Sequence, residues 1–141
     1  MKMKIKTIVF IISILIFTSC SEEPKTILFN SEAFAFSIGD GWEINASVNA
    51  KGFAQIEKDN SELYFTNLNY TVNLYTPEDT IYNADYGSVI DSTNEEILDK
   101  QIESQIELNS GFMAGNYLIE FIVEDKYSNT KDTLSTKLVL E

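Results

Sequence analysis

The stretch GNYLIEFIVED, residues 115–125, decides the fold because it alternates with the period of a β-strand. From 117 to 123 its odd-numbered positions carry tyrosine, isoleucine, phenylalanine and valine, while its even-numbered positions mix leucine, isoleucine and glutamate. Successive side chains of a strand point to opposite faces, so the odd-numbered positions predict a face that packs into a core. A β-rich domain is therefore expected around this segment.

A second alternating run at 134–141 follows the first after a polar loop at 126–131. The loop contains asparagine and serine, whose side chains favour turns by hydrogen bonding to nearby backbone. We expect the two runs to pair as a hairpin with Glu120 opposite Lys137 and Leu118 opposite Val139, give or take two residues. In that register opposite charges meet and apolar side chains meet.

The same two-residue period recurs through the rest of the chain. It predicts strands at 42–49, 68–75 and 102–108, and weaker strands at 33–38, 53–56 and 63–66. One short helix is expected at 93–100, where Ser92 or Thr93 could cap the first turn with a glutamate three residues on. Seven or eight short strands predict an all-β, antiparallel β-sandwich over residues 33–141. A closed barrel of the lipocalin type has the same alternation and stays an alternative.

The segment Gly115-Asn116-Tyr117 and the strand after it resemble the penultimate strand of bacterial immunoglobulin-like and fibronectin-type modules. The resemblance implies an immunoglobulin-like β-sandwich of about seven strands, in which Tyr117 is the corner tyrosine and Trp42 a core aromatic residue. The cysteine pair of antibody domains is absent, because the chain has one cysteine. The resemblance therefore supports the sandwich and no particular subfamily.

That cysteine, Cys20, follows a lysine-rich start and an apolar run from Thr7 to Phe17. Eleven residues span only about 16 Å as a helix, against about 30 Å of membrane hydrocarbon. The pattern resembles a bacterial lipoprotein signal with its lipobox, although Phe17 stands where leucine is usual. The resemblance implies a signal peptide at 1–19, removed by cleavage, and a covalent lipid on Cys20 that anchors the protein in a membrane.

Residues 20–32 are expected to form a lipidated acidic tether ahead of the domain. The sequence Ser21-Glu22-Glu23 resembles an export tag of Gram-negative lipoproteins, which implies an outer-membrane lipoprotein of the cell envelope, exposed at the surface. A solvated tether with no export role is equally compatible with these residues.

The charge of the chain excludes one class of partner. The formal net charge is −12, and removing the three lysines of residues 1–19 gives 7 − 22 = −15. A domain this acidic repels the phosphates of nucleic acids, so neither DNA nor RNA is expected as a partner.

The residue types also restrict the chemistry. The chain has no histidine, and its one cysteine lies at the lipid site, which excludes histidine-based triads and histidine zinc sites. Carboxylate pairs such as Glu103 and Glu107 have the spacing of residues on one solvated face of a strand. We therefore expect no enzyme activity. A carboxylate-dependent hydrolase is the alternative. No cofactor is expected beyond the lipid; calcium is a weak candidate at Asp125, Asn129 and Asp132.

Tyrosines supply the one binding signal. Tyr75, Tyr82 and Tyr86 bracket an acidic segment at 76–94, and a tyrosine ring offers an apolar face with a polar tip that suits proteins and sugars. Outward residues of the terminal hairpin form a second candidate patch: Leu118, Ile122 and Val139.

These features predict a lipid-anchored, non-catalytic binding or interaction module of the cell envelope. It would act as an accessory subunit of an outer-membrane or surface complex, or as an adhesion module, with a protein partner in the envelope. The alternative is a surface carbohydrate-binding lipoprotein that captures nutrients, with a glycan as its partner.

Overall fold

The computed structural model describes residues 22–141, which form eight strands and no helix. The predicted signal peptide and Cys20 lie outside the described residues. The strands are β1 (Ile27–Ile38), β2 (Gly41–Lys51), β3 (Ile56–Glu57), β4 (Tyr64–Tyr75), β5 (Thr80–Thr93), β6 (Asp99–Leu108), β7 (Gly115–Asp125) and β8 (Lys131–Leu140).

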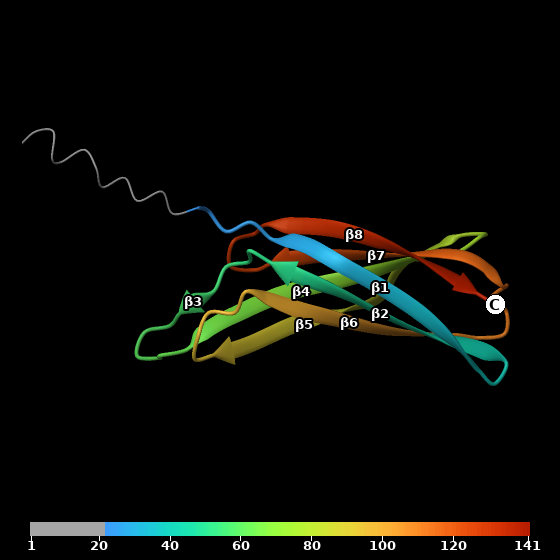
Figure 1. Cartoon of the computed structure of the whole chain (residues 1–141), viewed down its shortest axis with the longest axis horizontal. Helices are drawn as coiled ribbons and strands as arrows, with labels where there is room; N and C mark the ends of the chain where they lie inside the picture. Colours follow the sequence, from blue (N-terminus) through green and yellow to red (C-terminus); the bar gives the residue numbers. More distant parts are fainter. Residues whose placement is uncertain (1–21) are drawn as a thin grey trace, which may run out of the picture.

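The strands form two antiparallel sheets that pack face to face (Figure 1). The three-stranded sheet has the order β1-β2-β6, and the five-stranded sheet has the order β3-β4-β7-β8, with β5 paired to the other side of β4. No ladder joins β1 to β8 or β5 to β6 within residues 22–141, so these residues do not form one closed sheet. The predicted antiparallel β-sandwich is confirmed.

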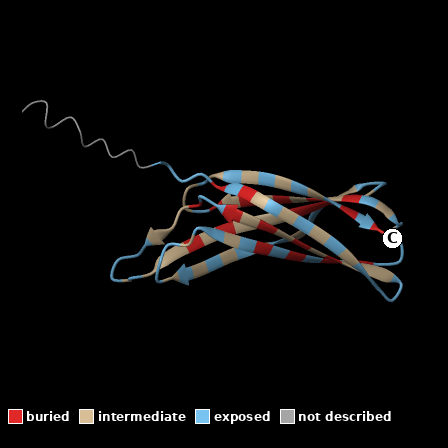
Figure 2. Cartoon of the chain, in the orientation of Figure 1, coloured by how far each residue is buried: buried red, intermediate tan, exposed pale blue. Residues whose placement is uncertain are grey.

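The core lies between the two sheets and follows the predicted alternation. Figure 2 shows buried positions recurring along each central strand between more exposed ones. The largest fully buried apolar side chains come from both sheets: Phe121, Ile44, Leu68, Leu74, Ile102, Ile119, Leu140, Val48, Val72 and Val123. Each of these contributes about 1.5 to 3 kcal/mol by leaving water, so the core explains why the chain folds without a disulfide.

The folded domain begins earlier than the predicted boundary at residue 33. Strand β1 starts at Ile27, and the backbone N–H of Lys25 already donates to the carbonyl of Gly52 at 2.8 Å. Thr26 is buried, and its N–H donates to the hydroxyl of Thr130 at 3.0 Å. The second half of the predicted tether is therefore part of the sandwich, because its backbone is hydrogen-bonded to it.

The expected helix at 93–100 is wrong. Thr93 ends β5, Asp99 begins β6, and the residues between them cross from the five-stranded sheet to the three-stranded one. The side-chain amide of Gln55 donates to the carbonyl of Ile97 and accepts from its N–H, at 2.9 and 2.8 Å. These bonds replace the hydrogen bonds that a helical turn would make.

The acidic segment 76–94 contains a strand that the alternation does not predict. Thr80–Thr93 forms β5, the longest strand, which pairs with β4 along most of its length. Its register shifts between Val72 and Leu74 of β4, which marks a β-bulge, and Asn83 there has a φ of 53°. The bulge breaks the two-residue period, and this hides the strand in the sequence.

The terminal hairpin is confirmed, with a register two residues from the predicted one. Leu118 pairs with Lys137 and Glu120 with Ser135. A shift of two residues keeps every side chain on its predicted face. The cause is a shorter loop: Asn129 has a φ of 57°, its N–H donates to the carbonyl of Asp125 at 2.8 Å, and β8 starts at Lys131 instead of 134.

Gly41, at the start of β2, has no room for a side chain. A Cβ at this position would lie 2.0 Å from the carbonyl oxygen of Leu108, which is backbone and cannot move aside. We expect Gly41→Ala to lower the free energy of unfolding by about 2 to 3 kcal/mol, measured by urea denaturation.

Gly39→Ala is the matched control in the same turn. Gly39 has a φ of +55°, with no atom within 4 Å of the added Cβ, so only backbone strain of about 1 kcal/mol is expected. Equal losses in the two variants would contradict the steric explanation for Gly41.

Candidate functional site

The three tyrosines singled out in the sequence lie on one surface, the outer face of the five-stranded sheet. Tyr86 pairs with Thr71, and Tyr75 pairs with Thr80, on the side of β4 opposite to its buried apolar residues. Tyr82 lies two residues after Thr80 in β5, so its side chain is on the same face of the sheet. Tyr82 and Tyr86 are 69% and 73% exposed, so their rings are open to solvent.

The second candidate patch belongs to the same surface. Leu118 is flanked by Tyr75 on one side and Lys137 on the other, and Ile122 lies next to Thr71 on the neighbouring strand. Val139 also points outward and is 53% exposed. The two patches are therefore one surface, the tyrosine face, which we define by Tyr75, Tyr82, Tyr86, Leu118, Ile122 and Val139.

Hydrogen bonds fix the middle of the tyrosine face. Glu120 accepts from the hydroxyl of Tyr75 at 3.1 Å and from the amide of Asn73 at 2.9 Å, and Asn73 in turn accepts the N–H of Asn83 at 3.0 Å. The hydrogen bond to Glu120 raises the pKa of Tyr75 above its usual value, and burial and the charge of Glu120 act in the same direction. Tyr75 is thus held in place, whereas Tyr82 and Tyr86 are the more exposed rings.

The tyrosine face is hollowed in two places. A depression of about 540 Å³ is lined by Asn69, Tyr70, Thr71, Asn83, Tyr86, Gly87 and Ser88. A second, of about 480 Å³, is lined by Tyr75, Thr76, Asn116, Tyr117, Leu118 and Lys137. Both combine aromatic rings with amide and hydroxyl groups, a lining suited to a polar partner that also has apolar surface.

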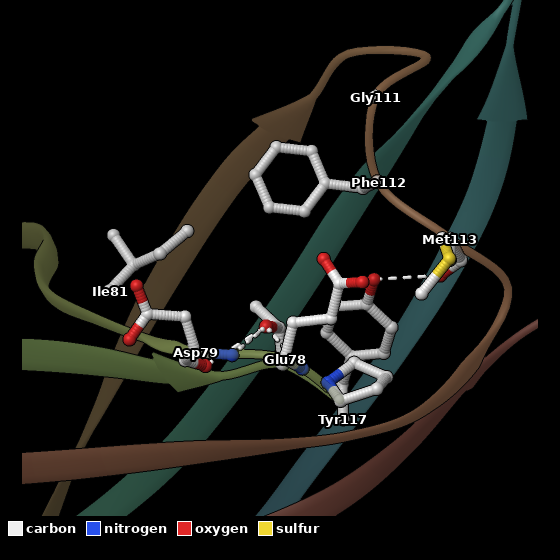
Figure 3. A pocket seen from close by; sticks show the side chains of 9 residues that line it. Glu78, Asp79, Ile81, Gly111, Phe112, Met113 and Tyr117 are labelled. Carbon is white, nitrogen blue, oxygen red and sulfur yellow. Dashed lines mark hydrogen bonds between the residues drawn. The ribbon is translucent and has the colours of Figure 1, made fainter.

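A separate pocket of about 300 Å³ lies between the β4–β5 turn and the β6–β7 loop. Figure 3 shows Phe112 and Ile81 on its apolar side, with the carboxylates of Glu78 and Asp79 nearby. The hydroxyl of the buried Tyr117 donates to the carbonyl of Met113 at 2.7 Å. Burial, and secondarily the charge of Glu78, raises the pKa of Tyr117. The hydrogen bond of Tyr117 therefore ties the start of β7 to the loop that precedes it.

The calcium candidates make hydrogen bonds within the domain. The buried carboxylate of Asp125 accepts the N–H groups of Tyr127 and Ala54, at 2.9 and 2.7 Å, and the hydroxyl of Ser128 at 2.5 Å. Asp132 accepts the N–H of Leu28 at 2.8 Å. These bonds join the β7–β8 hairpin to the chain before β3 and to the start of β1.

Residues 22–141 contain no cluster of three or more acidic, cysteine or histidine side chains that could hold a metal ion. Glu103 and Glu107 are exposed along the outer face of β6, the position expected of a solvated strand face. The expectation that the protein is not an enzyme stays a prediction.

Asn73 and Glu120 were missed as site residues in the sequence. Both stand in runs that predict strands, but nothing in the alternation shows that they meet, because they come from strands separated by more than forty residues. The one sequence signal for this site is Glu120, which is the only charged residue in the run from Leu118 to Val123.

No protein-family model matches the chain, and a search of curated proteins finds no match. In the described part of the chain there is no helix long and apolar enough to cross a membrane. Function is therefore inferred from the residues and their arrangement.

Proposed function

We propose that the protein is a lipid-anchored, non-catalytic binding module of the cell envelope, and that the tyrosine face contacts its partner. The partner is a protein of the envelope, which makes this chain an accessory subunit of an outer-membrane or surface complex, or an adhesion module. Cys20 carries the lipid, and residues 21 to 24 are the tether.

The observation that carries the proposal is the convergence of the two candidate patches on one surface. Tyr82 and Tyr86 are large, exposed side chains, and outward Leu118 and Ile122 extend the apolar area across β7. Tyrosine is enriched at protein interfaces because it buries much apolar area at a low cost in conformational entropy. The polar groups around these rings would form the rim of such an interface.

We also assign the sandwich to the immunoglobulin-like class. Two observations support the assignment: the penultimate strand β7 lies between β4 and β8, and Tyr117 bonds back to the backbone four residues upstream. Such domains commonly present binding surfaces on a rigid β-scaffold.

A glycan is the second candidate partner. Tyr86 lies beside Ser88 and Asn69, whose side chains hydrogen-bond to each other at 2.7 Å, and the 540 Å³ depression is lined by all three. Amide and hydroxyl groups next to an exposed ring suit a sugar, which has hydroxyls at its rim and apolar C–H faces.

Cross-linking in native membranes tests the proposal. A benzophenone side chain at position 86 is expected to capture a specific envelope protein, and the same group at Asp59, in the exposed turn between β3 and β4, is not. Tyr82→Ala/Tyr86→Ala should weaken binding to the captured protein by about tenfold or more. If position 86 captures nothing and a glycan array binds the chain through these tyrosines, the glycan is the partner.

A further inference from the structure

The second half of strand β1 points its large side chains away from the core. Its register with β2 places Ala33 and Ala35 opposite the buried Ala46 and Ile44, so the alanines face the core. The apolar residues between and after them face solvent on the three-stranded sheet. We call Phe34, Phe36 and Ile38 the β1 stripe; they are 52%, 54% and 49% exposed.

The β1 stripe is an ordered surface. The rings of Phe34 and Phe36 contact each other edge to face, with centroids 5.2 Å apart. The outer faces of β2 and β6 beside it carry no apolar side chain: they consist of Glu43, Asn45, Ser47, Asn49 and Lys51, and of Gln101, Glu103, Gln105 and Glu107. A lone apolar stripe at the edge of a polar face indicates a contact surface.

The edge of β1 is also free for a further strand. β1 is an outer strand of the three-stranded sheet. β8 lies beside the first half of β1, where the carboxylate of Asp132 accepts the N–H of Leu28, but the two strands form no ladder (Figure 1). The edge along Ala33–Ile38 therefore offers backbone groups that no strand of the described domain pairs with. Such an edge is a template for strand addition.

The other long outer strands carry features that guard against edge pairing, and this half of β1 does not. β5 points Asp91 inward, where its carboxylate pairs with Lys100, and it also carries a bulge. Lys100 itself points inward from β6, the other outer strand of the three-stranded sheet, because it pairs with the buried Ala50. β8 carries Lys131 and Lys137 on its outer face. Inward charges, bulges and lysines are the usual guards against edge pairing. Residues 33–38 contain no charge and no proline, and the β1 bulge lies earlier, between Phe29 and Glu32.

The carboxylates around the β1 stripe indicate the sign of the charge that a partner should carry. Glu43 lies opposite Phe36, Glu107 lies opposite Glu43, and Glu32 precedes the stripe on β1. None of these three carboxylates has an ion pair among residues 22–141. A partner that covers the stripe must bring positive charge to this acidic border.

We propose that the β1 stripe is the docking site for an extended, lysine- or arginine-rich segment of a partner protein, which adds to β1 as a further strand. On the face that the added strand shares with the β1 stripe, its apolar side chains pack on Phe34 and Phe36, and its cationic side chains lie beside Glu32. Glu43 and Glu107, further in on the same face, add to the negative charge that attracts the segment. A second copy of this chain fits less well, since it would bring its own glutamates and a domain charge of 7 − 22 = −15. This surface is on the opposite sheet from the tyrosine face, so it is an additional contact, independent of the proposed function.

A peptide titration tests the proposal with the full chain as it is expressed. The probe is a fluorescein-labelled octapeptide, Val-Thr-Val-Thr-Lys-Thr-Lys-Thr, whose valines and lysines share one face of a strand. One comparison peptide replaces both lysines by glutamate. The other, the block peptide, places the two valines and two lysines at consecutive positions. Fluorescence anisotropy should show binding of the probe and of neither comparison peptide. Phe34→Thr/Phe36→Thr should weaken it about tenfold or more, because both rings lose their burial.

Ile90→Thr/Leu98→Thr is the matched control, since it removes two exposed apolar side chains that belong to neither the β1 stripe nor the tyrosine face, and it should leave peptide binding unchanged. Hydrogen exchange on the unmodified chain gives a second readout that needs no variant: the peptide should protect backbone amides within 33–38. Equal binding of the block peptide, or no added protection there, overturns the proposal. So does a dimer, or binding to lipid vesicles, that the Phe34/Phe36 variant abolishes.

Discussion

Asp125→Ala is expected to lose about 3 to 5 kcal/mol of folding free energy, because it leaves three buried donors without an acceptor. The N–H groups of Ala54 and Tyr127 and the hydroxyl of Ser128 all donate to this carboxylate. Asp125 is fully buried, so water cannot replace the lost acceptor at the same positions. The free energy of unfolding of a domain this size is about 5 to 15 kcal/mol in total. The variant should therefore be partly unfolded at growth temperature.

Urea denaturation of a graded series measures this effect. Asp132→Ala removes one hydrogen bond, to the N–H of Leu28, and should cost about 1 to 2 kcal/mol. Asp40→Ala, in the exposed turn between β1 and β2, should cost less than about 0.5 kcal/mol. If Asp125→Ala lowered the free energy of unfolding no more than Asp132→Ala does, the three hydrogen bonds to Asp125 would not explain the stability of this loop.

Cys20→Ala is expected to move the protein from the membrane fraction to the soluble fraction almost completely. Each buried methylene of an acyl chain contributes about 0.8 kcal/mol to membrane binding, so the loss of all acyl chains removes the anchor. The charge of residues 20–141, 7 − 22 = −15, gives the domain no attraction of its own to an anionic bilayer. Fractionation of cells that express the full chain measures the distribution.

Ser21→Ala is the matched control, because it changes the neighbouring residue and keeps the thiol proposed to carry the lipid. It should stay in the membrane fraction and incorporate labelled palmitate, whereas Cys20→Ala should incorporate none. Retention of the Cys20→Ala variant in membranes would show that another part of the chain holds the protein there.

The sandwich could be predicted from the sequence because apolar residues alternate with polar ones wherever every second side chain of a strand is buried. Strands β2, β6 and β7 bury every second residue for most of their length, so their sequences show the period of the fold. The face of each tyrosine followed from the same rule once its strand was known. The hairpin at the end of the chain came within two residues of its register for this reason.

Other features depend on contacts that no local pattern contains. β5 is an edge strand with a bulge at Asn83, so neither face of it is regularly buried. Asp125 has the sequence context of a solvated loop carboxylate, and only the approach of Ala54, 71 residues away, makes it a buried acceptor. Nothing in the sequence of 33–38 shows which face of β1 is buried, and the structure turns its alanines to the core and its phenylalanines to solvent.

The pairing of β1 with β2 has a mechanical consequence. A pull on the chain ahead of Lys25 runs along β1, which pairs with β2 at positions from Ile27 to Ile38. Antiparallel hydrogen bonds lie perpendicular to the strands, so tension along β1 shears many of them together and cannot open them one at a time. Figure 1 places the β1–β2 turn at the far end from the point where the chain enters the domain. Force between the proposed tether and a partner bound at that end would therefore load the β1–β2 hydrogen bonds in shear, so that many must break at once.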